Sequence, residues 1–311
     1  MPFSTASGSR QGVRPFLKWA GGKRQLLGDL RRFVPAVVSA YHEPFLGSAA
    51  LFFDLWKSGH LREIPCALGD ANRDLIGVYR AVARDPDEVI AELRRLATLH
   101  ARDGEPAYYQ VRDRLFNPGR RQHEAAGLDS YPPALAAMFI YLNRTGYNGL
   151  FRLNSSGDFN VPAGRYRNPG ICDEKLLRSV SAVLGSERVT LKVQPFTAVE
   201  AAARRGDFVY FDPPYAPLSP TASFTSYTAA AFSDEDQRTL QALVVRLARR
   251  GCSVVVSNST APVVRDLYES REAREAGLET HRIGARRAIN SKASRRGLVE
   301  EFVISNVKPR H

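Results

Sequence analysis

Hydrophobic positions along this chain follow two spacings, and the changes between them outline a fold. Short apolar runs that end at turn residues predict strands, and apolar residues three or four positions apart predict helices. Strands are expected at 41–44, 64–68, 189–193, 208–211 and 253–257, with two more flanking 285–298. Helices are expected at 49–57, 73–83, 173–184, 198–204, 235–250 and 263–268. This alternation predicts an α/β protein built on a mostly parallel sheet.

The middle of the chain lacks strand patterns. Three consecutive segments, 86–101, 106–116 and 132–145, begin with proline in a first helical turn and carry helical apolar spacing. We therefore predict that a helical domain interrupts the α/β domain. The expected division is a flexible extension at 1–14, an α/β domain formed by 15–72 and 170–311, and a helical domain at 73–169.

Composition places the chain among globular proteins. Of its 311 residues, 44% are hydrophobic and 24% are charged, and no apolar run reaches the ~18 residues of a membrane span. The polar start of the chain, without an apolar signal core, predicts a cytoplasmic protein. Three cysteines and six histidines lack metal-ligand spacing, so we expect reduced thiols and no metal.

A positive charge balance indicates an anionic partner. The formal net charge is +12, which suits a nucleic acid but also fits arginines spread over a solvated surface. The segment ARRAINSKASRRGL, 285–298, concentrates basic residues without an acid. It includes Arg286 and Arg287, and we expect a basic loop that contacts phosphates.

Loops at the carboxyl ends of strands hold ligands in open α/β sheets. The first, EPFLGSAAL, carries Glu43, Phe45 and Gly47 in a tight turn but lacks the dinucleotide glycine spacing. The second, LGDANRDL, places Asp70 where it can accept hydrogen bonds from ribose hydroxyls or cap the next helix.

A glycine pair near the start of the chain is a further candidate for ligand binding. In FLKWAGGKRQLL the glycines and Lys23 precede a predicted helix, and Trp19 offers a flat apolar face. Unpaired amides and a cation suit a carboxylate or a phosphate, although capping alone also accounts for the glycines. The spacing is not that of a P-loop.

The most specific signal is DPPY, which directly follows the predicted strand 208–211. Prolines can simply end a strand, but an acid there can also act on an amine conjugated with a ring. The carboxylate of Asp212 and the carbonyl of Pro213 can accept its two hydrogens, which aims the nitrogen lone pair at an electrophile. Tyr215 can stack on the ring, and Pro214 completes the catalytic cluster. A base in DNA would have to flip out to reach it.

Together these motifs resemble the Dam family of DNA adenine N6-methyltransferases. The resemblance runs in order through FLKWAGGK, EPFLGSA, GDANRDL, YLNRTGYNGLFRLN, GDFNVPAGRY, YFDPPYAPLSPTASFTSY, SNST and RRAINS. It implies a Rossmann-like methyltransferase sheet with an antiparallel terminal strand, a catalytic α/β domain and a helical target-recognition insert. It also implies S-adenosylmethionine as methyl donor, with Trp19 and Lys23 near its methionine end, Asp70 on its ribose and Asp212 beside donor and target. Glu43, Phe45 and Gly47 are expected to line the same site.

The segment 141–166 interleaves arginines with aromatic residues, which suits base contact and stacking. In the Dam family the matching hairpin reads 5′-GATC-3′. The resemblance implies that Tyr147 wedges into the base stack, Asn148 supports the orphaned pair, and Arg152 grips a guanine. Further DNA contacts are expected from Lys18, Arg144, Leu150, Pro162, Arg165 and Tyr166.

Several features leave alternatives open. Thr145, Phe151 and Ala49 depart from the best-known members, which bears on the recognition sequence and on cofactor affinity. The DPPY chemistry also fits methyltransferases of RNA or of protein glutamine, and a catalytically dead DNA-binding relative is a second rival. The chain lacks the dinucleotide glycine spacing of a nicotinamide oxidoreductase, which makes that class the weakest alternative. We expect a monomer associated with the nucleoid, acting in replication or beside a cognate restriction nuclease.

Overall fold

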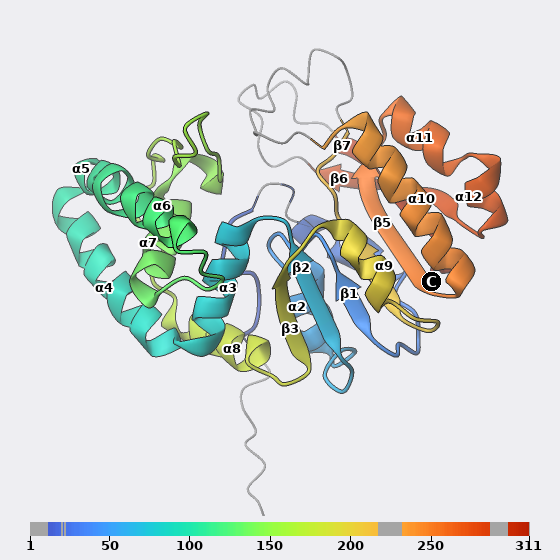
Figure 1. Cartoon of the computed structure of the whole chain (residues 1–311), viewed down its shortest axis with the longest axis horizontal. Helices are drawn as coiled ribbons and strands as arrows, with labels where there is room; N and C mark the ends of the chain where they lie inside the picture. The colour runs from blue at the N-terminus through green and yellow to red at the C-terminus, as the bar shows by residue number, and fades with distance from the viewer. Residues whose placement is uncertain (1–11, 20, 22, 217–231, 287–297, 311) are drawn as a thin grey trace, which may run out of the picture.

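A seven-stranded mixed sheet runs through the computed structural model of the chain (Figure 1). The structure describes residues 12–310 except 20, 22, 217–231 and 287–297. The strands are β1 (Tyr41–Glu43), β2 (Cys66–Asp70), β3 (Val189–Val193), β4 (Phe208–Phe211), β5 (Ser253–Ser259), β6 (Glu279–Arg286) and β7 (Leu298–Ser305). Their order is β3-β2-β1-β4-β5-β7-β6. The first five are parallel, and β7 lies antiparallel between β5 and β6. The predicted Rossmann-like sheet with an antiparallel terminal strand is confirmed.

Alternating strand residues bury the two faces of the sheet in two separate cores. In β4, Phe208 and Tyr210 belong to one apolar cluster, whereas Val209 and Phe211 belong to the other. Successive side chains of a strand point to opposite faces, and both faces of this strand are covered. The run FVYF is therefore apolar throughout because it lies in the middle of a three-layer structure.

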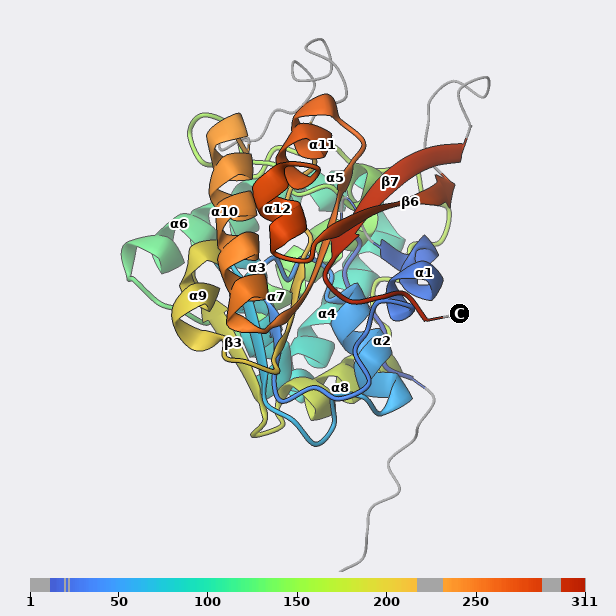
Figure 2. The same cartoon turned by 90° about the vertical axis from the view of Figure 1, so that its right-hand side faces the viewer.

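Helices cover both faces of the sheet (Figures 1 and 2). The helices that contribute to the first core are α1 (Leu27–Arg31), α2 (Ala50–Ser58), α3 (Arg73–Arg84) and α8 (Glu174–Leu184). Those of the second core are α9 (Val199–Ala202), α10 (Asp234–Arg250), α11 (Pro262–Tyr268) and α12 (Arg271–Glu275). Ser233 and Asp236 form a capping box that begins α10, since each side chain accepts from the other's backbone amide.

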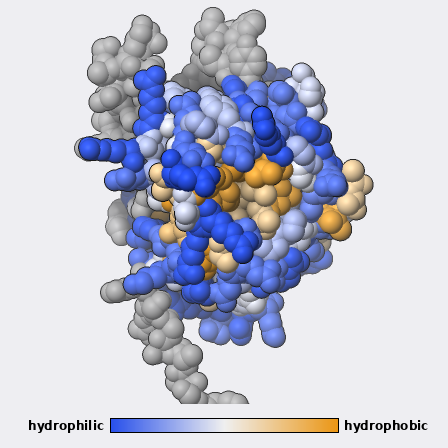
Figure 3. Space-filling model, turned by 90° about the vertical axis from the view of Figure 1, so that its left-hand side faces the viewer, coloured by the Kyte–Doolittle hydropathy of each residue, from blue (hydrophilic) through white to orange (hydrophobic). Residues whose placement is uncertain are grey.

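The central helices pack at one end of the molecule, away from β6 and β7 (Figure 1). They are α4 (Pro86–Asp103), α5 (Glu105–Tyr109), the π-helix η2 (Gln110–Phe116), α6 (Asn117–Ala125) and α7 (Pro133–Thr145). The buried side chains of α4, α5, η2 and α7 join the same apolar cluster as α3 and the first face of the sheet, whereas those of α6, Asn117 and Arg120, are polar. On this side of the molecule, hydrophobic residues gather in a hollow bordered by hydrophilic ones (Figure 3).

Several element boundaries differ from the sequence prediction. The second strand begins at Cys66 and extends to Asp70, and the helix expected at 198–204 is the single turn α9 after a 3-10 turn. The segment 106–116 divides into α5 and a π-helix. Helices α6 and α12 were not predicted, and the helix predicted after the glycine pair is a 3-10 turn at Lys23–Gln25 followed by α1. In α6, Pro118 and Gly119 resemble a turn, but the chain enters α6 directly from the π-helix, with Phe116 and Asn117 in helical conformation.

The described part of the expected N-terminal extension is attached to the fold. Arg14 pairs with Asp173 at 2.8 Å, just before α8; residues 1–11 lie outside the described part. Across the described residues, no helix is both long and apolar enough for a bilayer crossing.

Candidate active site

The candidate site lies where the order of the strands reverses. Strands β1 and β4 are adjacent and parallel, and later strands are added outward from each of them. Loops that follow such a pair diverge and leave a crevice at the carboxyl edge of the sheet. Glu43 ends β1, and Asp212 directly follows β4. The strand 208–211 thus delivers its acid to the position where α/β proteins bind ligands.

Asp212 is part of a charged cluster drawn from distant segments. Its Oδ1 lies 2.7 Å from the Nζ of Lys23, which also donates to the carbonyl of Gly21 at 2.8 Å. The same ammonium lies 4.3 Å from the centre of the Tyr215 ring, and the Tyr215 hydroxyl donates to Glu301 on β7. Burial raises the pKa of Asp212 to about 6, and the charge of Lys23 limits that rise.

Side chains of β5 and α10 fix the backbone of the DPPY turn. Gln237 donates to the Pro214 carbonyl at 3.4 Å and accepts from the Asn258 amide at 3.0 Å. Ser259 donates to the Ala216 carbonyl at 2.7 Å. In the described part of the chain, the carbonyl of Pro213 accepts no such bond. Asn258 and Ser259 lie in the motif SNST, but the sequence predicted no role in the site for them or for Gln237 and Glu301.

The loops after β1 and β2 are joined by Asp70. Its two carboxylate oxygens accept from the backbone amides of Gly47 at 3.0 Å and Asn72 at 2.9 Å. Asn72, not Asp70, caps α3, because its side chain accepts from the Leu75 amide. The alternative role of Asp70 as N-cap is therefore wrong. Burial raises the pKa of Asp70, and the hydrogen bonds from backbone amides oppose the rise.

Two features of the structure require a glycine at position 47. Its φ is +47°, in the left-handed region that favours glycine. A β-carbon there would lie 3.1 Å from the Trp19 ring. Ala49 adopts a left-handed conformation too, with φ at +56°. Ala49 is the residue that interrupts the usual glycine pattern. A left-handed alanine is strained, so this departure introduces backbone strain at the start of α2.

Two other predicted cofactor residues are partly or wholly covered. Glu43 is 2% exposed and accepts from the Tyr41 hydroxyl at 2.7 Å. Burial raises its pKa to about 8, and the nearby Asp212 and Asp70 add to that rise. Phe45 stacks on Phe196 with ring centres 5.2 Å apart and packs edge-on to Phe232. This aromatic group borders the second core.

The segment 141–166 leaves α7 and folds back along itself through two isolated antiparallel bridges, Gly146 with Ala163 and Leu153 with Phe159. A hollow of about 460 Å³ is lined by Tyr147, Asn148, Ala163, Gly164, Arg165 and Tyr166. Tyr147 is 50% exposed, and Asn148 has φ at +54°. The structure thus gathers four of the predicted DNA contacts around one hollow.

The remaining predicted contacts differ in accessibility. Pro162 and Arg165 are exposed, while Leu150 is half-buried against the core. Arg152 is held by a hydrogen bond from its Nε to the Asn160 side chain at 2.8 Å. Burial lowers the pKa of Arg144, and Asp173 opposes the change. Arg286 ends β6, and Arg287 lies outside the described residues.

The segment around Lys18 connects the hairpin with the acid cluster. The Lys18 backbone amide and carbonyl bond to the Asn143 side chain at 2.8 and 2.7 Å, and its Nζ lies 3.8 Å from the Tyr166 ring centre. Trp19 stacks on Phe151 at 6.0 Å, and Lys23 reaches Asp212. Asn143 also bonds to the Gly149 carbonyl at 3.0 Å. Lys18, Trp19 and Lys23 thus connect the two candidate sites.

A family model for D12 class N6 adenine-specific DNA methyltransferases matches residues 19–289. The chain belongs to this family. It is an adenine-specific DNA methyltransferase, which excludes the alternatives of an RNA, protein-glutamine or nicotinamide enzyme. The match includes Lys23, Asp212, Tyr215 and the hairpin in one range, and it ends before Glu301.

Relatives of this D12 methyltransferase cover nearly its whole length. It is 37% identical to the Type II methyltransferase M1.LlaDCHI of Lactococcus lactis subsp. cremoris over 94% of this chain and 95% of the relative. It is 37% identical to M.MjaIII of Methanocaldococcus jannaschii, over 94% and 99%. It is 34% identical to the DNA adenine methylase of Escherichia coli K12, over 93% and 94%.

Among solved structures, this D12 methyltransferase matches precorrin-6y C5,15-methyltransferase from Geobacter metallireducens at 8% identity. The match has a TM-score of 0.37 and covers 94% of this chain and 97% of that one. Similarity at this level carries no argument, so the strand order alone supports the description of the fold. Where side chains are described, no three acidic, cysteine or histidine residues form a group that could hold a metal ion.

Proposed function

We propose that this enzyme transfers a methyl group from S-adenosylmethionine to N6 of an adenine flipped out of double-stranded DNA, within 5′-GATC-3′. The observation that supports this most strongly is the meeting of Asp212, Lys23 and Tyr215 at the strand-order reversal, connected through the Lys18 segment to an exposed hairpin.

The residues around the first two loops fit the proposed donor. Gly47 forms a turn that a side chain would block, and the Asp70 carboxylate keeps lone pairs beyond those used by two amides, which suits ribose hydroxyls. Trp19 provides an apolar face, and Lys23 a cation for the methionine carboxylate. When bound, S-adenosylmethionine supplies an electrophilic methyl group. We propose that Phe45 and its aromatic neighbours border this site, with Glu43 supporting it from beneath.

The DPPY turn is suited to hold the target amine. At neutral pH Asp212 is mainly a carboxylate, since its pKa is about 6, and it can accept one N–H of the amine. The Pro213 carbonyl can accept the other, whereas the Pro214 carbonyl is taken by Gln237. Two acceptors on one side make the nitrogen more tetrahedral and direct its lone pair away from them. Tyr215, braced by Glu301, offers a ring for stacking on the base.

The hairpin supports GATC as the recognition sequence. The residue types matched to base contacts, Tyr147, Asn148 and Arg152, are all present and not buried. The two departures within the hairpin point inward: Thr145 is buried and bonds to the Tyr141 carbonyl at 2.7 Å. Phe151 stacks on Phe139 at 5.2 Å. Neither departure therefore alters a residue that faces DNA in the proposed complex.

The biological setting has two candidates. Some relatives are named Type II methyltransferases and others DNA adenine methylases, which fits either partnership with a restriction nuclease or solitary marking of DNA. We propose a monomeric enzyme in either setting. Neighbouring genes distinguish the two.

The Asp212→Ala variant tests the proposed chemistry. It should abolish methyl transfer to adenine while DNA affinity stays within about threefold, because Asp212 acts on the flipped amine and not on the duplex. Transfer is measured with labelled S-adenosylmethionine and binding with a gel-shift titration. The matched control is Asp266→Ala, an exposed acid in α11, which should leave both values unchanged. Full activity in Asp212→Ala would end the proposed mechanism.

A further inference from the structure

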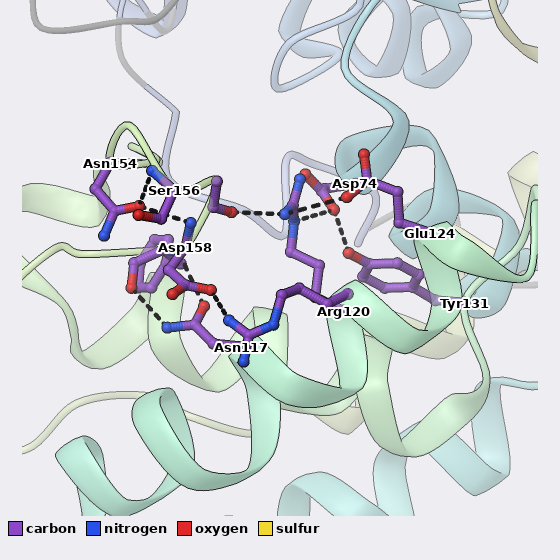
Figure 4. A network of polar contacts seen from close by, with 11 residues as sticks. Asp74, Asn117, Arg120, Glu124, Tyr131, Asn154, Ser156 and Asp158 are labelled. Atoms are coloured by element: carbon purple, nitrogen blue, oxygen red, sulfur yellow. Dashed lines mark hydrogen bonds and ion pairs between the residues drawn. The ribbon is translucent and has the colours of Figure 1, made fainter.

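A buried ion pair links the start of α3 to the far end of the hairpin (Figure 4). Asp74, four residues after Asp70, accepts from the Nε of Arg120 on α6 at 2.7 Å and from the Tyr131 hydroxyl. The Nη1 of the same arginine donates to the carbonyl of Gly157 at 2.7 Å. Arg120 is 8% exposed, Asp74 7% and Tyr131 2%.

The bonded carbonyl belongs to the turn that closes the hairpin. Gly157 has φ at +78°, and its amide donates to the Asn154 carbonyl at 3.0 Å. The Asn154 side chain accepts from the amides of Ser156 and Asp158 at 3.0 and 2.8 Å. The turn lies between Arg152 and its partner Asn160, so its position determines where the Arg152 guanidinium is held.

A second set of polar contacts also holds the hairpin to α6. Asn117, at the start of α6, exchanges two hydrogen bonds with the backbone of Phe159, at 3.0 and 2.9 Å. Helix α6 therefore holds the hairpin by its backbone, and Arg120 ties α6 to α3. Buried ion pairs contribute little net stability because desolvation offsets their attraction, whereas they do fix a particular arrangement.

We infer that Arg120 is a positioning residue for sequence recognition: it fixes the hairpin turn against α3, so that Arg152 is presented at one place relative to the catalytic sheet. This rests on the proposed function of the hairpin as the DNA reader. Arg120 itself touches no base. Its removal should loosen discrimination between sites more than it slows methylation of the preferred site.

The chain supplies a matched control. Arg121 adjoins Arg120 and pairs with Asp158 of the same turn, but it is exposed and does not reach α3. We expect Arg120→Met to lower discrimination against duplexes altered at the base pair read by Arg152 by about tenfold, with kcat on the preferred duplex within about threefold. Arg121→Met should leave the discrimination ratio unchanged.

Removing Arg120 alone leaves Asp74 buried without its cation, so the variant Asp74→Asn/Arg120→Met, which removes both charges, provides a second measurement. In both variants, amide hydrogen exchange of residues 157–160 should be faster than in the wild type and in Arg121→Met. An unchanged discrimination ratio with unchanged exchange in the folded double variant would overturn the inference. A wild-type enzyme without any sequence preference would instead contradict the proposed function.

Discussion

Lys23 is the residue whose charge most directly affects Asp212, the proposed catalytic carboxylate. Its ammonium lies 2.7 Å from Asp212 and limits the rise of that carboxyl's pKa above its usual value. Below about pH 6 the carboxylate becomes protonated and loses its capacity to accept the amine N–H. Activity should therefore have an acid limb near that pH.

The Lys23→Met variant should move this limb to higher pH, because loss of the cation raises the Asp212 pKa further. The measurement is kcat/KM for DNA against pH at saturating S-adenosylmethionine, which separates the effect from weakened cofactor binding. Lys57→Met, an exposed change in α2, should keep the wild-type profile. An acid limb that stays in place in Lys23→Met would show that Lys23 does not set the Asp212 pKa.

Glu43 should make stability depend on pH. Its pKa is about 8 in the folded protein against a usual 4.5, so between these values the folded state keeps a proton that the unfolded chain releases. The free energy of unfolding therefore falls as pH rises through this window, by on the order of 5 kcal/mol. Chemical denaturation across the window measures this slope.

The Glu43→Gln variant should flatten that slope, because glutamine accepts the Tyr41 hydroxyl without titrating. Glu200→Gln serves as the control, since Arg246 lowers the pKa of Glu200, so this group should not titrate in the alkaline part of the window. Equal slopes in wild type and Glu43→Gln would mean that Glu43 is not the group responsible.

At the scale of elements, we expect different hairpin residues to read the base sequence and to bind the DNA backbone. Arg152 is oriented by Asn160 at 2.8 Å, which suits a bidentate contact with guanine. Arg152→Ala should reduce discrimination at one base pair by about 1–3 kcal/mol. Arg165 is exposed on the same hairpin, and Arg165→Ala should weaken binding to all sequences alike.

Competition binding with duplexes altered one base pair at a time measures both effects. A loss in Arg152→Ala that is uniform across sequences would reduce Arg152 to a phosphate contact. The two arginines lie on the same hairpin. A general loss of hairpin structure would therefore have the same effect on binding in both variants, which distinguishes it from the loss of one contact.

Strand positions were predictable because burial on both faces leaves an uninterrupted apolar signature, as in 208–211. Helix α6 was not, because its proline and glycine signal a turn and only the tertiary contacts of Asn117 and Arg120 favour the helix. Motif residues such as Asp70 and Asp212 could be identified from their position after strands. Supporting residues such as Gln237 and Glu301 could not, since they reach the site from segments distant in sequence.

For the whole molecule, two sites depend on one sheet and one connecting segment. The reversal of strand order places Asp212 beside the loops of Gly47 and Asp70. The Lys18 segment ties this region to the hairpin. A net charge of +12 favours association with a polyanion at low salt. Under the proposed function, the molecule thus combines DNA attraction, sequence reading and amine activation in a single chain.

The most direct test of the proposed function is methyl transfer from labelled S-adenosylmethionine to two duplexes of identical sequence containing GATC. One carries unmodified adenine, and the other carries N6-methyladenine at both target positions. If the enzyme methylates N6 of adenine in GATC, the first duplex is labelled, with N6-methyladenine as the labelled nucleoside, and the second is not. Equal labelling of the two duplexes would contradict the proposed function.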